Sequence, residues 1–117
     1  MSYKIAIASS NGESVNQHFG QAENFLIYEI TKEKVHFIVD RHVEKASDGT
    51  EHSEQGLIRL ADQLQDCKAV FVAKIGMKAS RYLYQRNIKS FQVDFTLHYI
   101  FTTLLANEQK GKVNIFN

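Results

Sequence analysis

The sequence AVFVA at residues 69–73 decides the fold, because it stands between two segments with the periodicity of amphipathic helices. A short apolar run of this kind is typical of a strand that is buried on both faces. The helix expected before it covers residues 54–66, and the helix expected after it involves Ala79 and ends near Asn87. Strands joined through a helix pair in parallel by a right-handed crossover. This part of the chain therefore predicts an α/β sheet.

The N-terminal segments extend this sheet. Residues 4–8 (KIAIA) form a second run suited to a central strand, which we expect to lie beside the run described above. Residues 25–30 and 35–39 predict two further strands, joined by a hairpin-length turn at 31–34. The polar stretch 40–53 is interpreted as an exposed loop.

The C-terminal segments complete the order of elements. Residues 91–93 predict a brief strand, and Thr96 can cap a last helix that ends near Gly111. Residues 113–116 can add a short edge strand. The sequence thus predicts one domain over residues 1–117, with three layers, flanking helices and a mixed, mostly parallel sheet of about five strands.

The composition restricts the classes of function. The chain has 117 residues, 44% of them hydrophobic, and a formal net charge of +1. Scattered basic residues with so little net charge argue against a nucleic-acid binder. No apolar run approaches the roughly 18 residues that span a bilayer. The lone Cys67 and a start without a signal-peptide pattern lead us to expect a cytoplasmic protein without membrane contact.

The stretch VNQHFG at residues 15–20 places one histidine in a polar loop between two strand-like runs. It follows SSNG at residues 9–12, and these residue types favour turns over a sheet ladder. A loop histidine can offer a neutral imidazole nitrogen to a soft or borderline metal. His18 is therefore the candidate metal ligand. The alternative is a histidine that hydrogen-bonds within its own turn.

A ligand crevice is expected where the two central strands end, because ligands of open α/β sheets bind beyond the carboxyl ends of parallel strands. The histidine loop follows one of these ends, and a helix start with free N–H groups follows the other. Nearby lysines add positive charge, so the crevice suits an anion. The predicted ligand-binding residues are Ser10, Asn16, Gly20, Gly76 and Lys78. The alternative is a tight turn at Gly76 with solvated lysines.

Other chemistry finds less support in the sequence. Cys67 lies at the amino end of its strand, away from the crevice, and is interpreted as a buried structural cysteine. The other histidines, His36, His42, His52 and His98, lack metal-ligand spacing. No carboxylate cluster, nucleophile elbow, P-loop or dinucleotide motif is present, so we expect a protein that is not an enzyme.

Three segments together resemble the dinitrogenase iron–molybdenum cofactor biosynthesis family, which includes NifX-like proteins and the C-terminal domain of NifB. They are KIAIAS at residues 4–9, VNQHFGQA at 15–22 and FLIYE at 25–29. CKAVFV at 67–72 and the pair Ile75-Gly76 are also similar. The resemblance implies a ribonuclease-H-like fold and the binding of an iron–sulfur or iron–molybdenum–sulfur cofactor precursor in nitrogenase assembly. The histidine of the HFG motif, here His18, is then the candidate cluster ligand.

The leading hypothesis is thus a carrier or store of an iron–molybdenum cofactor or iron–sulfur precursor, with nitrogenase assembly proteins as partners. One alternative is an adaptor that binds a protein or small anion without metal, and another is a carrier of a different molybdenum–sulfide cluster. We also expect residues 10–20, alongside 44–52, to be mobile without ligand, because only Val15 and Phe19 offer the first of these segments apolar anchors.

Overall fold

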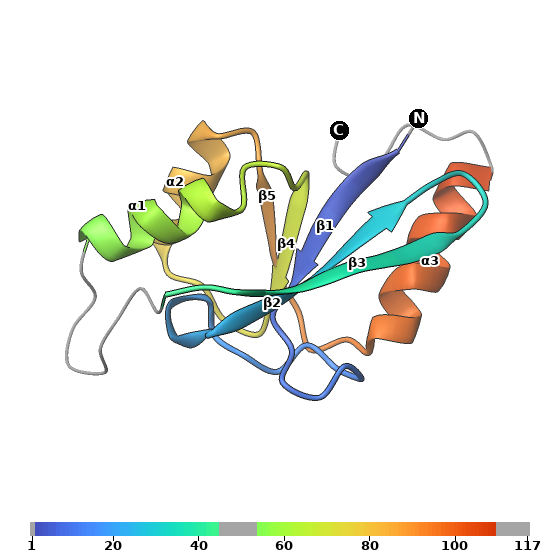
Figure 1. The fold of residues 1–117 in the computed structure, drawn as a ribbon, viewed down its shortest axis with the longest axis horizontal. Coiled ribbons are helices and arrows are strands. Elements are labelled where there is room, and N and C mark those ends of the chain that lie inside the picture. Colours follow the sequence, from blue (N-terminus) through green and yellow to red (C-terminus); the bar gives the residue numbers. More distant parts are fainter. Residues whose placement is uncertain (1, 45–53, 110–117) are drawn as a thin grey trace.

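Five strands form one mixed sheet in the order β3-β2-β1-β4-β5 (Figure 1). The computed structural model describes residues 2–44 and 54–109. Within these residues the strands are β1 (Tyr3–Ile7), β2 (Asn24–Ile30), β3 (Val35–His42), β4 (Ala69–Val72) and β5 (Lys89–Gln92). The helices are α1 (Glu54–Gln63), α2 (Met77–Gln85) and α3 (Leu97–Gln109), with a 3₁₀ turn, η1, at Phe19–Gln21.

The prediction that the first and fourth strands are central neighbours is confirmed. β1 pairs in parallel with β4, which pairs in parallel with β5. β1 also pairs antiparallel with β2, which forms a hairpin with β3 through the predicted turn; Thr31 N–H donates to the Lys34 carbonyl at 2.9 Å.

The expectation of a mostly parallel sheet is wrong. The antiparallel ladders hold five and seven residue pairs, whereas the parallel ladders hold three and four. The difference arises because β2 pairs antiparallel with both β1 and β3, whereas β4 and β5, which form the parallel ladders, are only four residues long each. The assignment to the ribonuclease-H-like class stays a prediction.

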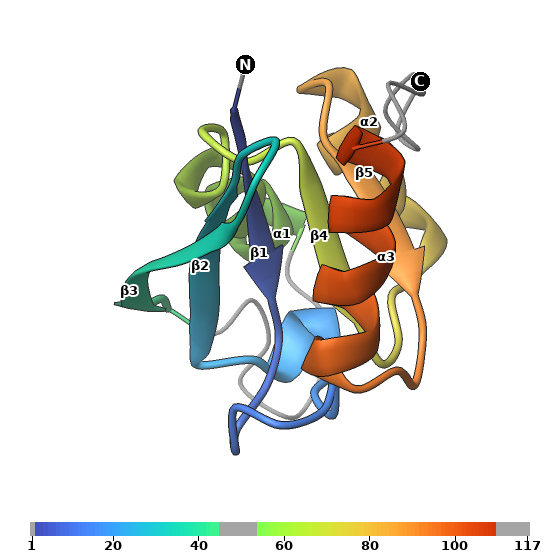
Figure 2. The ribbon, with the colours of Figure 1, turned by 90° about the vertical axis from the view of Figure 1, so that its right-hand side faces the viewer.

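Helices cover both faces of the sheet and give the expected three layers. Helices α1 and α2 pack on one face and α3 on the other (Figures 1 and 2). Side chains alternate along β1, so Ala6 joins the core under α1 and α2, whereas Ile5 and Ile7 join the core under α3. Burying such an isoleucine contributes roughly 1.5–3 kcal/mol, which explains why both faces of β1 are apolar.

Several element boundaries differ from the prediction. Strand β3 continues to His42 instead of ending at Val39, because Asp40 and Arg41 keep the backbone pairing with β2. Helix α1 ends at Gln63, since the next residues form turns with shorter-range bonds such as Leu64 N–H to the Ala61 carbonyl at 3.1 Å. The rest of the expected loop from residue 45 to 53, the edge strand at 113–116 and the helix end near Gly111 lie outside the described residues.

The sequence predicted the start of α3 and, less accurately, the end of α2. The predicted cap of α3 is confirmed, because Thr96 Oγ1 accepts a hydrogen bond from the Tyr99 N–H at 3.1 Å. The helix expected to end near Asn87 ends at Gln85, and Asn87 itself has a left-handed φ of 60°. No helix within residues 2–44 and 54–109 is long and apolar enough to span a membrane.

Candidate functional site

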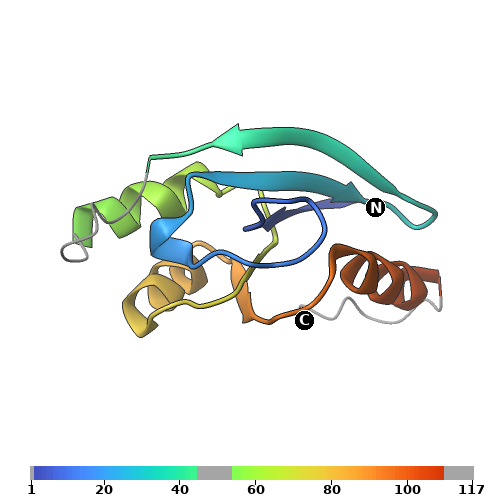
Figure 3. The ribbon, with the colours of Figure 1, turned by 90° about the horizontal axis from the view of Figure 1, so that it is seen from below.

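A cavity of about 550 Å³ lies beyond the carboxyl ends of β1 and β4, where the sequence placed a crevice. Two segments form its walls: η1 with the residue before it, and the connection from β4 into the first turn of α2. Figure 3 shows these segments lying side by side. The lining residues are His18, Phe19, Gly20, Gln21, Leu57, Lys74, Ile75, Gly76, Met77, Lys78 and Ala79.

The backbone around His18 is fixed by pairing with the chain that leaves β4. The Ala73 N–H donates to the Gln17 carbonyl at 2.9 Å, and the Phe19 N–H donates to the Lys74 carbonyl at 2.9 Å. His18 and Lys74 form a parallel bridge between these bonds. Phe19 is 1% exposed and its ring lies 6.0 Å from that of Phe25, so the buried phenylalanine anchors the exposed histidine beside it.

The start of α2 supplies the opposite wall of the cavity. Gly76 is the N-cap, with an extended φ of −82°, and no side chain caps the helix. The next three residues, Met77 to Ala79, all line the cavity. Because the first N–H groups of a helix have no partner within the helix, this wall presents hydrogen-bond donors and the positive end of the helix dipole.

The formal charge of the lining is positive. Lys74 and Lys78 line the cavity, both exposed, and none of the lining residues that the structure describes is acidic. An anion gains from both ammonium groups and from the helix start, whereas a bare divalent cation has only the imidazole of His18 as a strong donor. The arrangement therefore suits an anion that also carries a metal atom.

Four of the six predicted site residues meet at this cavity. They are His18, Gly20, Gly76 and Lys78. Ser10 and Asn16 do not line the cavity, and their part in binding stays a prediction. Asn16 Nδ2 donates to Ser10 Oγ at 2.9 Å, and the Ser10 N–H donates to Asn16 Oδ1 at 2.9 Å. These two polar residues thereby close the loop on itself.

The loop before His18 is also better anchored than the sequence indicated. Val15 is 4% exposed and its N–H donates to the Phe95 carbonyl at 3.0 Å. Asn11 Oδ1 accepts from the N–H groups of Glu13 and Ser14 at 2.8 and 3.1 Å. Both expected apolar anchors are buried, so the premise of few anchoring contacts fails for this loop.

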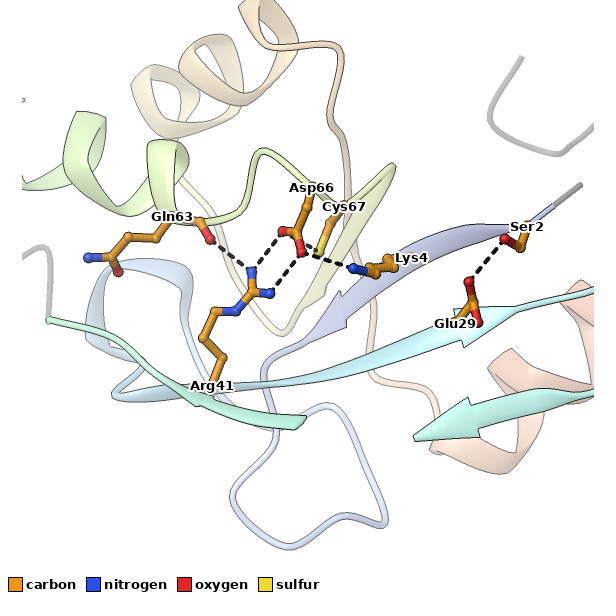
Figure 4. Close-up of polar contacts among 7 residues, drawn as sticks. All are labelled: Ser2, Lys4, Glu29, Arg41, Gln63, Asp66 and Cys67. Carbon is orange, nitrogen blue, oxygen red and sulfur yellow. Dashed lines mark hydrogen bonds and ion pairs between the residues drawn. The ribbon is translucent and has the colours of Figure 1, made fainter. Parts of the chain in front are cut away.

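Cys67 lies outside the cavity lining and belongs to a structural cluster at the opposite end of β4 (Figure 4). It is 4% exposed, as predicted, and burial raises the pKa of its thiol to about 12. Its neighbour Asp66 accepts two hydrogen bonds from Arg41 at 2.8 Å, and Lys4 Nζ lies 3.6 Å from Asp66 Oδ2. These contacts lower the pKa of Asp66 to about 2, with the Arg41 hydrogen bonds as the main cause.

The part of the chain that the structure describes contains no cluster of acidic, histidine and cysteine side chains suited to a metal ion, at the cavity or elsewhere. Within those residues, histidine, cysteine, aspartate and glutamate side chains form no group of three or more that could hold a metal ion. His36 and His42 lie on β3, and His98 lies in the first turn of α3. The fourth, His52, lies outside the described residues.

Sequence reasoning missed several residues of the cavity. Leu57 lines the cavity from α1. Its helical spacing did not indicate this position, because apolar residues of the core have the same spacing. Gln21, Ile75 and Met77 were also not chosen. Met77 had a detectable signal, since it directly follows the glycine at the predicted helix start.

Comparison with known proteins places the chain in a family. NifX of Azotobacter vinelandii is 35% identical over 91 residues, which cover 77% of this chain and 56% of NifX. The FeMo cofactor biosynthesis protein NifB of the same organism is 38% identical over 77 residues, covering 63% of this chain and 15% of NifB. The chain thus spans only part of both relatives.

The fold is also similar to a solved structure, the crystal structure of PH0822. The TM-score is 0.64 at 20% sequence identity, with 96% of this chain and 94% of that chain covered. The family model of dinitrogenase iron–molybdenum cofactor proteins matches residues 1–97. The chain therefore belongs to the dinitrogenase iron–molybdenum cofactor family.

Proposed function

We propose that this protein carries or stores an anionic metal–sulfur cluster, the iron–molybdenum cofactor or an iron–sulfur precursor of it, in the cavity beside His18. One observation carries the proposal: a single cavity collects an imidazole, two ammonium groups and an uncapped helix start, with no acidic residue among its described lining residues. The names of the NifB and NifX relatives and the family match support this cargo.

The donor set fits a cluster that brings its own sulfides. A sulfide-bridged cluster has most metal positions already filled, so one imidazole from the protein completes one open position. Its negative charge is then balanced by Lys74, Lys78 and the N–H groups of α2. The cluster is cargo, and the chain holds it by one coordinate bond plus charge.

The exposure of His18 fits a carrier better than an enzyme. His18 is an exposed residue of the cavity lining, and among the described lining residues there is neither a nucleophile–base pair nor a carboxylate cluster. A ligand that a receiving protein can reach permits release of the cargo. Assembly proteins of nitrogenase are the partners that this function implies.

Anaerobic titration with isolated iron–molybdenum cofactor tests the proposal. We expect the protein to retain iron and molybdenum through gel filtration, with visible absorption of the bound cluster. His18→Ala should weaken retention about tenfold or more, which corresponds to about 1.4 kcal/mol. His98→Ala, an exposed histidine at the start of α3, is the matched control and should bind normally.

Two outcomes contradict the proposal. In the first, the wild-type protein holds no iron or molybdenum after filtration, and protein purified anaerobically from its host contains no metal. This result favours an adaptor that binds an anion or protein without metal. In the second, His18→Ala and wild type retain the cofactor equally, which removes the imidazole from the site.

Replacing Lys74 and Lys78 together by glutamine should reduce both the affinity and its dependence on salt, because the screened charge is lost.

A further inference from the structure

Met77 is the most exposed large apolar side chain in the described part of the structure. Its exposed fraction is 81%, against 75% for Tyr84 and 57% for Phe37. It is the first residue of α2, while the apolar residues that hold this helix to the sheet, Ala79 and Leu83, are buried. Met77 thus contributes little to packing, and it lines the same cavity as His18.

A thioether at this position has a chemical use that a solvated polar residue lacks. Methionine sulfur is a soft, polarisable donor that prefers thiophilic metals such as copper(I). Met77 follows Lys74 by three residues, the Lys74 backbone is bridged to that of His18, and both Met77 and His18 line the cavity. One cavity of about 550 Å³ therefore contains a nitrogen donor and a sulfur donor on opposite walls.

We infer that Met77 is a second metal ligand of the cavity, so that the site selects cargo with a thiophilic metal at its surface. This inference rests on the proposed function for the identity of the cargo, but the donor pair itself can be tested with a metal ion alone. Binding involves donation of the sulfur lone pair and loss of a weakly held ligand from the metal. No proton is released, because a thioether has none.

The two ligands have different consequences for the cargo. The imidazole accepts borderline metals in general, whereas the thioether adds a preference for soft ones. Contact with the bound cluster also covers the exposed side chain of Met77, so burial of apolar surface adds to the affinity. Leucine in place of Met77 keeps most of that burial and removes the donor, which separates the two contributions.

The methionine content makes a direct measurement feasible. The chain has two methionines, Met1 and Met77, so labelling with [methyl-¹³C]methionine gives one signal from the cavity and one internal reference. The probe is copper(I) alone, added anaerobically. We expect the Met77 methyl signal to shift in proportion to bound copper and the Met1 signal to stay in place.

Affinity for copper(I), measured by competition with a chromogenic chelator, gives the second readout. Met77→Leu should raise the dissociation constant about tenfold, and His18→Ala should do the same. Tyr84→Leu is the matched control, because Tyr84 is an exposed residue of α2 that does not line the cavity. Backbone spectra check that all variants keep the fold.

The outcomes separate this inference from the proposed function. An unmoved Met77 signal at saturating copper, or equal affinity of Met77→Leu and wild type, overturns the inference. If the cofactor binds wild type and Met77→Leu equally, the carrier function stands and the sulfur ligand is excluded. If copper shifts Met77 but the cofactor is not retained, the donor pair is supported and the proposed cargo is wrong.

Discussion

Arg41 and Asp66 connect β3 to the turn after α1 through two parallel hydrogen bonds, Nη1 to Oδ1 and Nη2 to Oδ2, each 2.8 Å long. Arg41 Nη1 also donates to the Gln63 carbonyl at 2.9 Å (Figure 4). The pair thereby holds the end of the edge strand against the end of a helix. Such two-bond pairs are stronger than single contacts between the same groups.

Replacing Asp66 by asparagine should destabilise the protein by roughly 1 kcal/mol at pH 7, a value reduced for screening because the side chain is 37% exposed. The pKa of Asp66 is lowered to about 2 in the folded state, so its contribution is complete above about pH 4 and lost as pH falls through 2. Urea unfolding from pH 7 to pH 2 measures this change.

Arg59 provides the control for this prediction, because its contact with Glu44 is longer, at 3.6 Å, and more exposed. Arg59→Gln should change the free energy of unfolding by less than about 0.5 kcal/mol. A stability difference between Asp66→Asn and wild type that stays constant down to pH 2 contradicts the assigned role of the carboxylate.

Cys67 should be unreactive in the folded protein. Burial raises the pKa of its thiol to about 12, so almost no thiolate is present at pH 8. A chromogenic disulfide reagent should modify Cys67 only at the rate of unfolding, and at once in 8 M urea. Rapid stoichiometric modification without denaturant means that the thiol is accessible.

Amide exchange should divide the loop before the cavity into two parts. The N–H groups of Val15, Gln17 and Phe19 donate to backbone carbonyls, so we expect them to exchange slowly. The N–H groups of Glu13 and Ser14 donate to the side chain of an exposed asparagine and should exchange faster. Uniformly fast exchange from residue 11 to 19 instead supports the mobile loop expected from sequence.

Gly76→Asp should increase stability and weaken binding at the same time. A Cβ atom built on Gly76 has no neighbour within 4 Å, and the extended backbone suits an aspartate N-cap. The cap and the helix dipole should stabilise α2 by about 0.5 kcal/mol. The new negative charge stands at the cavity wall and repels an anionic cluster, which gel filtration with the isolated cofactor detects.

Gly76→Ser separates charge from capping in that experiment. Serine caps the helix without a charge, so it should raise the melting temperature similarly and reduce binding less than aspartate does. If both variants bind the cofactor as wild type does, charge near the start of α2 has no part in recognition.

The sequence predicted where the cavity lies better than it predicted which residues line it. The apolar runs predict strand ends at residues 8 and 73, one residue beyond the observed ends at Ile7 and Val72, and a general rule of α/β sheets then places the crevice. The sequence could not show that Asn16 lies outside the cavity lining and hydrogen-bonds Ser10, because the same residue type can bind a ligand or close its own loop. Leu57 could not be foreseen, since contact between α1 and the cavity depends on how the helices pack.

The backbone bridge between His18 and Lys74 has a kinetic consequence for a carrier. The two walls of the cavity are tied to each other by this bridge and by the two backbone hydrogen bonds beside it, so they separate only when these bonds open, which is rare for protected backbone bonds. Under the proposed function, cargo would then leave by direct exchange at the exposed imidazole when a recipient brings its own ligand into contact. The rate of transfer should rise in proportion to recipient concentration, with no plateau set by opening of the donor.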